Sequence, residues 1–261
     1  WYKKTQATKK ELSLQREKKW ASDAPKFSII VPLFKTPDNF LKELVSSIQS
    51  QTYSNWELCF ADGSPTDELK GLVEGFKDER ICYHFIGENL GISGNTNKAL
   101  EMATGDWIVL CDHDDLLVPN ALYEFADRIT KDPEIDSIYS DEDKIDETGK
   151  KLFEPHFKPD FNIDMLRSNN YICHLYGVRK ELVDRVGKFN SQFDGAQDYD
   201  FILRMSENSR KVGHVSKILY HWRTHINSTA ANPESKMYAF KAGAEAIKAH
   251  YARVLPNIKI K

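Results

Sequence analysis

Residues 27–33 read FSIIVPL, an unbroken apolar run with the length of one β-strand. Such a run is typical of a strand that is buried on both faces of a parallel sheet. Outward from it, strand-like and helical segments alternate, and this alternation predicts an α/β fold with a mostly parallel central sheet flanked by helices. The predicted strands are 27–33, 56–61, 81–86, 106–112 and 135–141, and the predicted helices are 38–51, 66–77, 93–103 and 119–130.

The alternation ends near residue 142. The stretch 144–172 contains a turn signal at Glu147-Thr148-Gly149 and otherwise reads as irregular. Beyond it the sequence predicts strands at 173–178 and 215–222, and helices from 179, at 198–208 and at 233–253. We therefore expect three parts: a basic arm or linker helix at 1–24, one α/β domain at 25–232, and a C-terminal segment at 233–261 whose helix packs on the domain.

The composition is that of a globular protein with a sizeable core, since 41% of the 261 residues are apolar and 29% are charged. No apolar run approaches the roughly 18 to 20 residues that a membrane-spanning helix needs, and residues 1–10 lack the apolar core of a signal peptide. The expected location is therefore cytoplasmic. The four cysteines show no C-x-x-C spacing, which indicates buried thiols rather than disulfides or a zinc site.

Charge is unevenly distributed along the chain. Residues 1–20 contain seven Lys and Arg and two Glu, a net +5, which leaves −8 for the remaining residues of a chain whose net charge is −3. An acidic body argues against a nucleic-acid-binding core. The basic arm is expected to be a solvated linker helix or, alternatively, a contact to a partner domain or to the inner face of a membrane.

Ligands of open α/β sheets bind at the carboxyl ends of the parallel strands. Asp112-His113-Asp114-Asp115 directly follows a predicted buried strand, and its three carboxylates repel one another unless a cation or hydrogen bonds compensate. Hard oxygen ligands suit Mg²⁺ or Mn²⁺. We expect Asp112 and Asp114 to serve a metal-dependent site, and Asp115 to cap a following helix at 116–120.

The chain lacks both a P-loop and a G-x-G-x-x-G turn. The nearest substitute is residues 89–97, NLGISGNTN, a small polar turn that enters a predicted helix. The first amides of such a helix can face an anion. This turn is the expected place for a phosphate contact.

Taken together, these stretches resemble family 2 glycosyltransferases of the bacterial polysaccharide and glycoconjugate type, which have the GT-A fold. The resemblance covers residues 26–230, about three quarters of the chain. It rests on FSIIVPLF, ADGS, NLGISGNTN, the Asp-x-Asp element in GDWIVLCDHDD, and FDGAQDYDF. It implies an inverting, Mn²⁺- or Mg²⁺-dependent transfer of a sugar, hexosyl or N-acetylhexosaminyl, from a nucleotide diphosphate sugar, first of all a UDP-sugar. The implied acceptor is a hydroxyl of a glycan, glycoprotein or lipid-linked saccharide.

The resemblance also implies roles for single residues. Asp62 would bind the base, Asp112 the ribose and Asp114 the metal, while Asp198 would be the general base. The remaining implied contacts to the nucleotide sugar are Pro32, Phe34, Asn89, Gly91, Asn97 and Arg223, with His225 as a further metal ligand. For His221 a functional and a solvated role are equally expected, Asp200 is expected to be structural, and so are His84, His156, His174, His214 and His250.

One position departs from the family pattern. Many relatives have Arg before the Asn of the glycine turn, whereas this chain has Thr96 before Asn97. Either Lys98 or Arg223 must then supply the missing cation, or the donor is held differently.

Two other functions compete. A non-catalytic domain of the same fold could bind a sugar nucleotide or scaffold a larger synthase, although such a module has no need for both Asp114 and Asp198. A nucleotidyltransferase would require a glycine-rich basic loop after the first strand, where this chain has residues 32–37, PLFKTP.

The acceptor is expected against 144–172 and 193–195, where Phe153, Phe157 and Tyr171 either stack on a sugar or pack internally.

Overall fold

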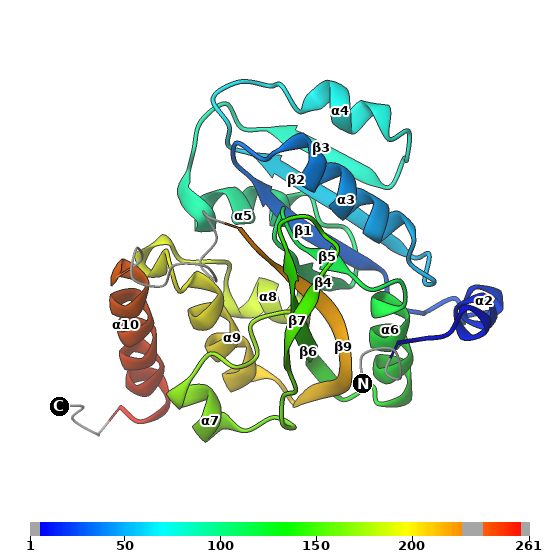
Figure 1. The fold of residues 1–261 in the computed structure, drawn as a ribbon. Helices are drawn as coiled ribbons and strands as arrows, with labels where there is room; N and C mark the ends of the chain where they lie inside the picture. The colour runs from blue at the N-terminus through cyan, green and yellow to red at the C-terminus, as the bar shows by residue number, and fades with distance from the viewer. Residues whose placement is uncertain (1–5, 226–236, 257–261) are drawn as a thin grey trace.

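The computed structural model describes residues 6–225 and 237–256, and Figure 1 shows a central sheet with helices on both faces. Over these ranges one nine-stranded sheet has the order β3-β2-β1-β4-β8-β6-β9-β5, with β7 paired to β6. The strands are β1 (Phe27–Leu33), β2 (Trp56–Asp62), β3 (Ile81–Phe85), β4 (Trp107–Leu110), β5 (Leu116–Leu117), β6 (Ile135–Asp146), β7 (Leu152–His156), β8 (Tyr176–Arg179) and β9 (Lys211–Thr224). The helices are α2 (Lys9–Glu17), α3 (Asp38–Gln49), α4 (Lys70–Gly75), α5 (Gly91–Glu101), α6 (Ala121–Lys131), α7 (Ile163–Ser168), α8 (Lys180–Val186), α9 (Gln197–Asn208) and α10 (Met237–Val254), with a 3-10 turn η1 (Ser191–Phe193).

The α/β class is confirmed, but the sheet is mixed rather than mostly parallel. Strands β3, β2, β1 and β4 are parallel, as the alternation predicts. Next to them β8 runs antiparallel to β4, and β6 antiparallel to β8. The strand predicted at 135–141 therefore lies beyond β8, a strand that comes later in the chain.

Strand β1 is buried along its whole length, and Ser28 is its one polar residue. Phe27, Ile29 and Val31 belong to the core on the face that α3 and α6 cover. Ile30 belongs to the second core, on the face of α5, α8 and α9. A strand between two cores has no face on which a polar residue can reach water.

The stretch after β4 is more regular than the sequence predicts. A hairpin joins β6 to β7, and its turn confirms the predicted one at 147–149: the amide of Gly149 donates to the carbonyl of Asp146. Gly149 has φ +70°, a left-handed conformation that glycine adopts without strain. The region 144–172 thus continues β6 and adds β7 and α7.

A buried carboxylate ties the parallel strands together. Glu57 on β2 accepts hydrogen bonds from Ser28 Oγ (2.6 Å), Lys26 Nζ (2.6 Å), and the amide and hydroxyl of Thr104. Burial alone would raise the pKa of Glu57, but these bonds outweigh it and lower the pKa to about 2. The ionised carboxylate is therefore part of the fold.

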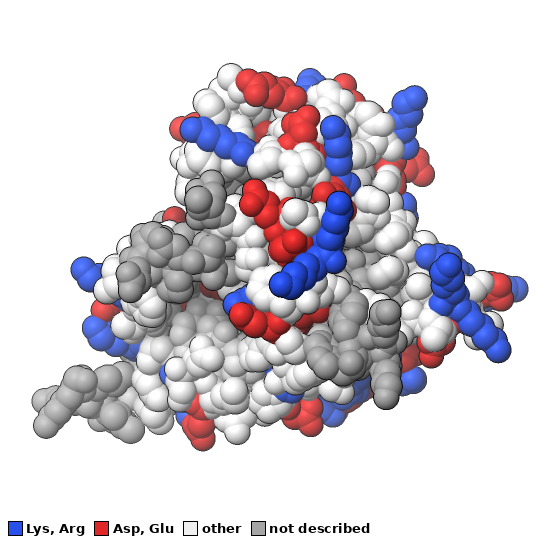
Figure 2. Space-filling view, viewed as in Figure 1, with Lys and Arg blue, Asp and Glu red and all other residues white. Residues whose placement is uncertain are grey.

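The basic arm forms a helix that reaches the body. Helix α2 begins with a capping box between Thr8 and Glu11. Just after it, Lys18 Nζ lies 2.8 Å from Asp127, and the ring of Trp20 packs edge-on against Tyr53. Figure 2 shows Lys and Arg side chains gathered over α2, at the right of the view.

The C-terminal helix α10 lies beside α9, at the left of Figure 1. Residues 233–236 of the predicted helix lie outside the described residues, as do 226–232. Of the helices that the structure describes, none is long and apolar enough to span a membrane.

Candidate active site

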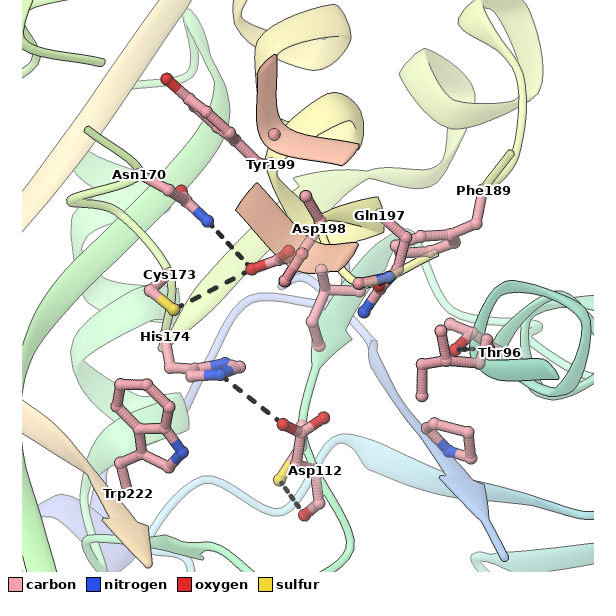
Figure 3. Close-up of a pocket in the computed structure, with 18 of the residues that line it drawn as sticks. Thr96, Asp112, Asn170, Cys173, His174, Phe189, Gln197, Asp198, Tyr199 and Trp222 are labelled. Carbon is pink, nitrogen blue, oxygen red and sulfur yellow. Dashed lines mark hydrogen bonds and ion pairs between the residues drawn. The ribbon is translucent and has the colours of Figure 1, made fainter. Parts of the chain in front are cut away.

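A cavity of about 740 Å³ opens at the carboxyl ends of β1 and β4. Three of the predicted site residues line it: Pro32, Asp112 and Asp198. Its other walls come from the loop 168–174 that precedes β8, from the start of α9, and from α10. Figure 3 shows the side chains of Asp112 and Asp198 pointing into this one cavity.

The direction of β8 brings the loop 168–174 to the cavity. Because β8 is antiparallel to β4, its first residue Tyr176 pairs with Leu110, the last residue of β4. The residues before β8 therefore lie at the same edge as the carboxyl end of β4. His174 Nε2 lies 3.7 Å from Asp112 Oδ2, and its ring stacks on Tyr220 at 4.8 Å.

His174 lines the cavity, although the sequence predicts a structural role for it. The missing signal is the strand start: the sequence predicts a strand from 173, which would place residue 174 inside the sheet, whereas β8 begins at Tyr176. Asn170 and Cys173, which belong to no motif of the sequence, line the cavity on the same loop.

Asp198 is held from that loop. It lies in the first turn of α9, and its Oδ2 accepts a hydrogen bond of 2.9 Å from Asn170 Nδ2. The thiol of Cys173 lies 3.9 Å from the same oxygen, and burial raises the pKa of this thiol well above its ordinary value. Asp200 is buried and bonded to Arg204 Nε at 2.8 Å, in keeping with the structural role expected for it.

A buried ion pair fixes the loop's backbone. The ammonium of Lys158 is fully buried and donates to Glu142 Oε2 (3.2 Å), to the carbonyl of Ile172 (2.6 Å) and to the carbonyl of His174. Burial lowers the pKa of Lys158, while the charge of Glu142 raises it. Glu142 also accepts a hydrogen bond from the His174 amide. The Lys158–Glu142 pair therefore binds both the amide and the carbonyl of His174.

The expectation that Asp115 caps a helix is wrong. Strand β5 follows it, and α6 begins later, after Asn120. The buried carboxylate of Asp115 accepts from Tyr220 Oη (2.5 Å) and from the Arg223 amide (2.6 Å). Burial raises the pKa of Asp115, and the charges of Asp114 and Asp112 raise it further.

Two arrangements could hold a divalent metal. Asp114 Oδ2 and His225 Nε2 lie 2.8 Å apart, which brings the two predicted metal residues together. Asp112, Asp115 and His174 also place ligand atoms within 4.8 Å of one another. The first pair supplies two ligand atoms and the second group three, and both are bonded within the protein in this structure. A carboxylate with an imidazole is a donor set that suits Mn²⁺.

Arg223 does not face the cavity. Its guanidinium is fully buried and donates to the Asp114 carbonyl (2.5 Å), the Glu147 carbonyl (3.0 Å) and Glu43 Oε2 (2.6 Å). These bonds join the acidic residues 112–115 to α3 and to the β6–β7 hairpin. In this structure the guanidinium is bonded within the protein, and its contact to a phosphate stays a prediction.

The glycine turn is also occupied from within the chain. Asp194 accepts from the amide and the hydroxyl of Ser93, so a protein carboxylate lies at the start of α5 where an anion was expected. A Cβ on Gly91 would lie 2.8 Å from Asp194 Oδ2. Asn97 exchanges two hydrogen bonds with the backbone of Phe189.

The same holds for the rest of this turn. Asn89 Oδ1 accepts from the Gly91 amide and from Asn95. Gly91, Asn89 and Asn97 thus fold the turn rather than face the cavity. Thr96 does line the cavity, but its hydroxyl bonds the carbonyl of Ile92, and Lys98 pairs with Glu101 on the surface. Neither cation proposed to replace the family Arg lies at the cavity.

The remaining predicted residues do not line the cavity. Asp62 is fully buried at the end of β2, where it accepts from the Ser64 amide (2.9 Å) and Tyr83 Oη (2.8 Å). Phe34 is partly exposed beyond β1, outside the cavity lining. His221 bonds Asp143. Of the predicted aromatics, Tyr171 is buried in the core, and neither Phe153 nor Phe157 lines the cavity.

Comparisons with known proteins agree on one family. The family model described as Glycosyl transferase family 2 matches residues 28–187. The uncharacterized protein y4gI of Sinorhizobium fredii is 41% identical over 259 residues, 97% of this chain and 28% of that protein. O-antigen biosynthesis protein RfbC of Myxococcus xanthus is 34% identical over 235 residues, 89% of this chain and 18% of that protein. The chain thus spans less than a third of the length of either relative.

A solved structure matches the fold. S. aureus TarS 1-349 in complex with UDP-GlcNAc has a TM-score of 0.70, over 90% of this chain and 68% of that one. The two chains are 18% identical, so this likeness concerns the fold.

Proposed function

The chain belongs to glycosyl transferase family 2 and has the GT-A fold, and from that premise we propose that it is an inverting glycosyltransferase. It moves a sugar from a UDP-sugar to a hydroxyl of a glycan or glycoconjugate. The observation that carries the proposal is the meeting of Asp112 and Asp198 in one cavity at the carboxyl edge of the sheet. The cavity's volume of about 740 Å³ lies within the roughly 300–1,000 Å³ range of small-molecule sites.

The proposed donor is a UDP-sugar because a chain of the same fold, TarS, was solved with UDP-GlcNAc. In this proposal Asp62 accepts a hydrogen bond from the base and Asp112 from the ribose, with Pro32 and Phe34 beside the nucleotide. Each oxygen of Asp62 already accepts one hydrogen bond, from Ser64 or from Tyr83, so the base shares an oxygen with one of these donors or replaces it.

Asp198 is the proposed general base. Asn170 engages its Oδ2, which leaves Oδ1 to take the acceptor's proton. The acceptor oxygen attacks the anomeric carbon as the bond to the diphosphate oxygen breaks, and the proton passes to Asp198. One base and one in-line displacement invert the anomeric centre. A positioned base of this kind contributes roughly 10² to 10⁴ in rate.

The proposed cofactor is Mn²⁺ or Mg²⁺, held by Asp114 and His225, whose ligand atoms already converge at 2.8 Å. When bound there, it would stabilise the charge of the leaving diphosphate. Asp114 lies two positions after the cavity residue Asp112, while neither Asp114 nor His225 lines the cavity itself.

The second candidate is a non-catalytic domain that binds a sugar nucleotide within a larger protein. It is kept because the chain spans less than a third of its first relatives and because its glycine turn is occupied by Asp194.

The basic arm is the proposed contact to a partner domain or a membrane surface, since several Lys and Arg side chains of α2 are exposed.

Calorimetric titration of UDP-sugars and free UDP, with and without Mn²⁺, tests the proposal. We expect one UDP-sugar to bind in the presence of the metal and the chain to transfer its sugar to a glycan. Metal-dependent binding without transfer to any glycan would favour the non-catalytic domain. No binding by any nucleotide would contradict both candidates.

A further inference from the structure

The wall of the cavity around Asp198 is made of amides. Asn169 and Asn170 come from the loop before β8, and Gln197 opens α9. Asn170 Nδ2 is bonded to Asp198, but its Oδ1 is buried and has no hydrogen-bond partner among the described residues. A buried oxygen without a donor costs free energy, so this atom indicates a ligand group that donates a hydrogen bond.

Two of the three charged side chains among the described lining residues are acidic. Among the described lining residues, the carboxylates are Asp112 and Asp198, and the one Lys or Arg is Lys144. The ammonium of Lys144 lies 2.5 Å from Glu154 and is thereby neutralised. An anionic group beside Asp198 would meet repulsion without a compensating cation.

An exposed aromatic ring lies at the same cavity. Phe240 on α10 lines it, yet 63% of the residue is exposed. The start of α10 is seated against Gly195, where a Cβ would lie 2.5 Å from the ring of Tyr238. Further along, Ala242 packs into the core beside α9. The ring of Phe240 is thus held at the cavity instead of in the core.

We propose that Phe240 and Asn170 form the acceptor subsite and that it takes the uncharged terminal sugar of a saccharide. The apolar face of the sugar ring lies on Phe240, and one of its hydroxyls donates to Asn170 Oδ1. Sites that bind small molecules commonly combine aromatic walls with a few placed polar groups. This inference rests on the proposed function, since it assigns the acceptor of the same reaction.

The test compares two acceptors and four proteins. The acceptors are a neutral hexose-terminated trisaccharide and the same trisaccharide oxidised at C6 of its terminal sugar to the uronic acid, assayed with UDP-GlcNAc and Mn²⁺. The proteins are the wild-type chain, Phe240→Ala, Phe240→Trp and Met237→Ala. Met237 is the matched control, because it lies on the same helix and is 61% exposed but does not line the cavity.

We expect Phe240→Ala to raise the acceptor KM about fivefold, in line with the worth of an aromatic contact, while the Kd of UDP-GlcNAc stays unchanged. Phe240→Trp should keep the wild-type KM, and Met237→Ala should match the wild type. The wild-type chain should use the neutral acceptor at least tenfold better than its uronic acid form.

An acceptor KM that is the same in Phe240→Ala and the wild type would overturn the subsite, as would equal use of both acceptors. Either result, obtained with a chain that binds UDP-GlcNAc and transfers its sugar, leaves the proposed function standing. A wild-type chain that neither binds a UDP-sugar nor modifies any acceptor would instead overturn the proposed function and the subsite with it.

Discussion

The side-chain amide of Asn170 donates a hydrogen bond to Oδ2 of Asp198 over 2.9 Å, so a loop residue orients the carboxylate that α9 carries. Removing a hydrogen bond to a charged group costs about 1.5–3 kcal/mol. We expect Asn170→Ala to lower kcat roughly 10- to 100-fold and to leave the donor Kd unchanged, as measured by initial rates and calorimetry.

The control for this variant is Asn208→Ala, the same change at the far end of α9, where the side chain bonds only the carbonyl of Arg204. It should keep wild-type kcat. A normal kcat in Asn170→Ala would show that Asp198 needs no orienting partner.

We expect Arg223 to stabilise the folded chain. Arg223→Ala removes a buried cation and leaves Glu43 and two carbonyls without their donor. Because the Glu43 side chain is 40% exposed and can be hydrated, we expect a loss of about 1.5–3 kcal/mol, the cost of losing hydrogen bonds to a charged group. Urea denaturation should show a loss of that order, whereas Lys42→Ala, which removes an exposed pair with Asp38, should change stability by less than about 0.5 kcal/mol. Unchanged stability together with weaker UDP binding would instead make Arg223 a phosphate contact.

Gly91 and Asp194 should be coupled. Gly91 has φ +77°, and a Cβ there would lie 2.8 Å from Asp194 Oδ2. A left-handed backbone conformation alone costs an L-residue about 1–2 kcal/mol, and the close contact adds to it. Gly91→Ala should therefore destabilise the wild-type chain more than it destabilises Asp194→Ala. A double-mutant cycle of unfolding free energies measures the difference, and equal penalties in both backgrounds would refute the contact.

Glu57 should make stability depend on pH. Its pKa in the folded chain, about 2, is below the ordinary value of 4.5, so the ionised carboxylate stabilises the fold above pH 4.5. That contribution is lost as the pH falls toward 2. Glu57→Gln should cost on the order of 2 kcal/mol at pH 7 and progressively less below pH 4. Urea denaturation at pH 7, 5 and 3.5 checks this, and a cost that does not vary with pH would contradict it.

The parallel half of the fold is predictable from the sequence because each of its units is local. The apolar run at 27–33 and the helical spacing at 38–49 need only near neighbours to be recognised. The insertion of β8 between β4 and β6 is not local, since those strands pair across dozens of residues. Because β8 is antiparallel to β4, its first residues rather than its last lie at the edge of the sheet that carries the site. The rule that ligands bind at the carboxyl ends of parallel strands does not predict this.

The site, like the fold, has a part that the sequence predicts and a part that it does not. Asp112 and Asp198 follow from motif positions, and the structure places both in the cavity. The burial of Arg223 is not predictable from the sequence, because its partner Glu43 lies 180 positions away. The spacing of residues in the sequence does not predict that an arginine at the end of a strand is fully enclosed by hydrogen-bond acceptors from two other elements.

The central claim is that Asp114 serves the metal-bound donor and Asp198 serves the acceptor's proton. Its most direct test is calorimetric titration of the wild-type chain, Asp114→Ala and Asp198→Asn with UDP-sugars and Mn²⁺, with transfer to a glycan followed in parallel. Asp114→Ala should lose metal-dependent donor binding, and Asp198→Asn should bind the donor like the wild type while its transfer rate falls at least about 10²-fold. Equal loss of donor binding in both variants would contradict it.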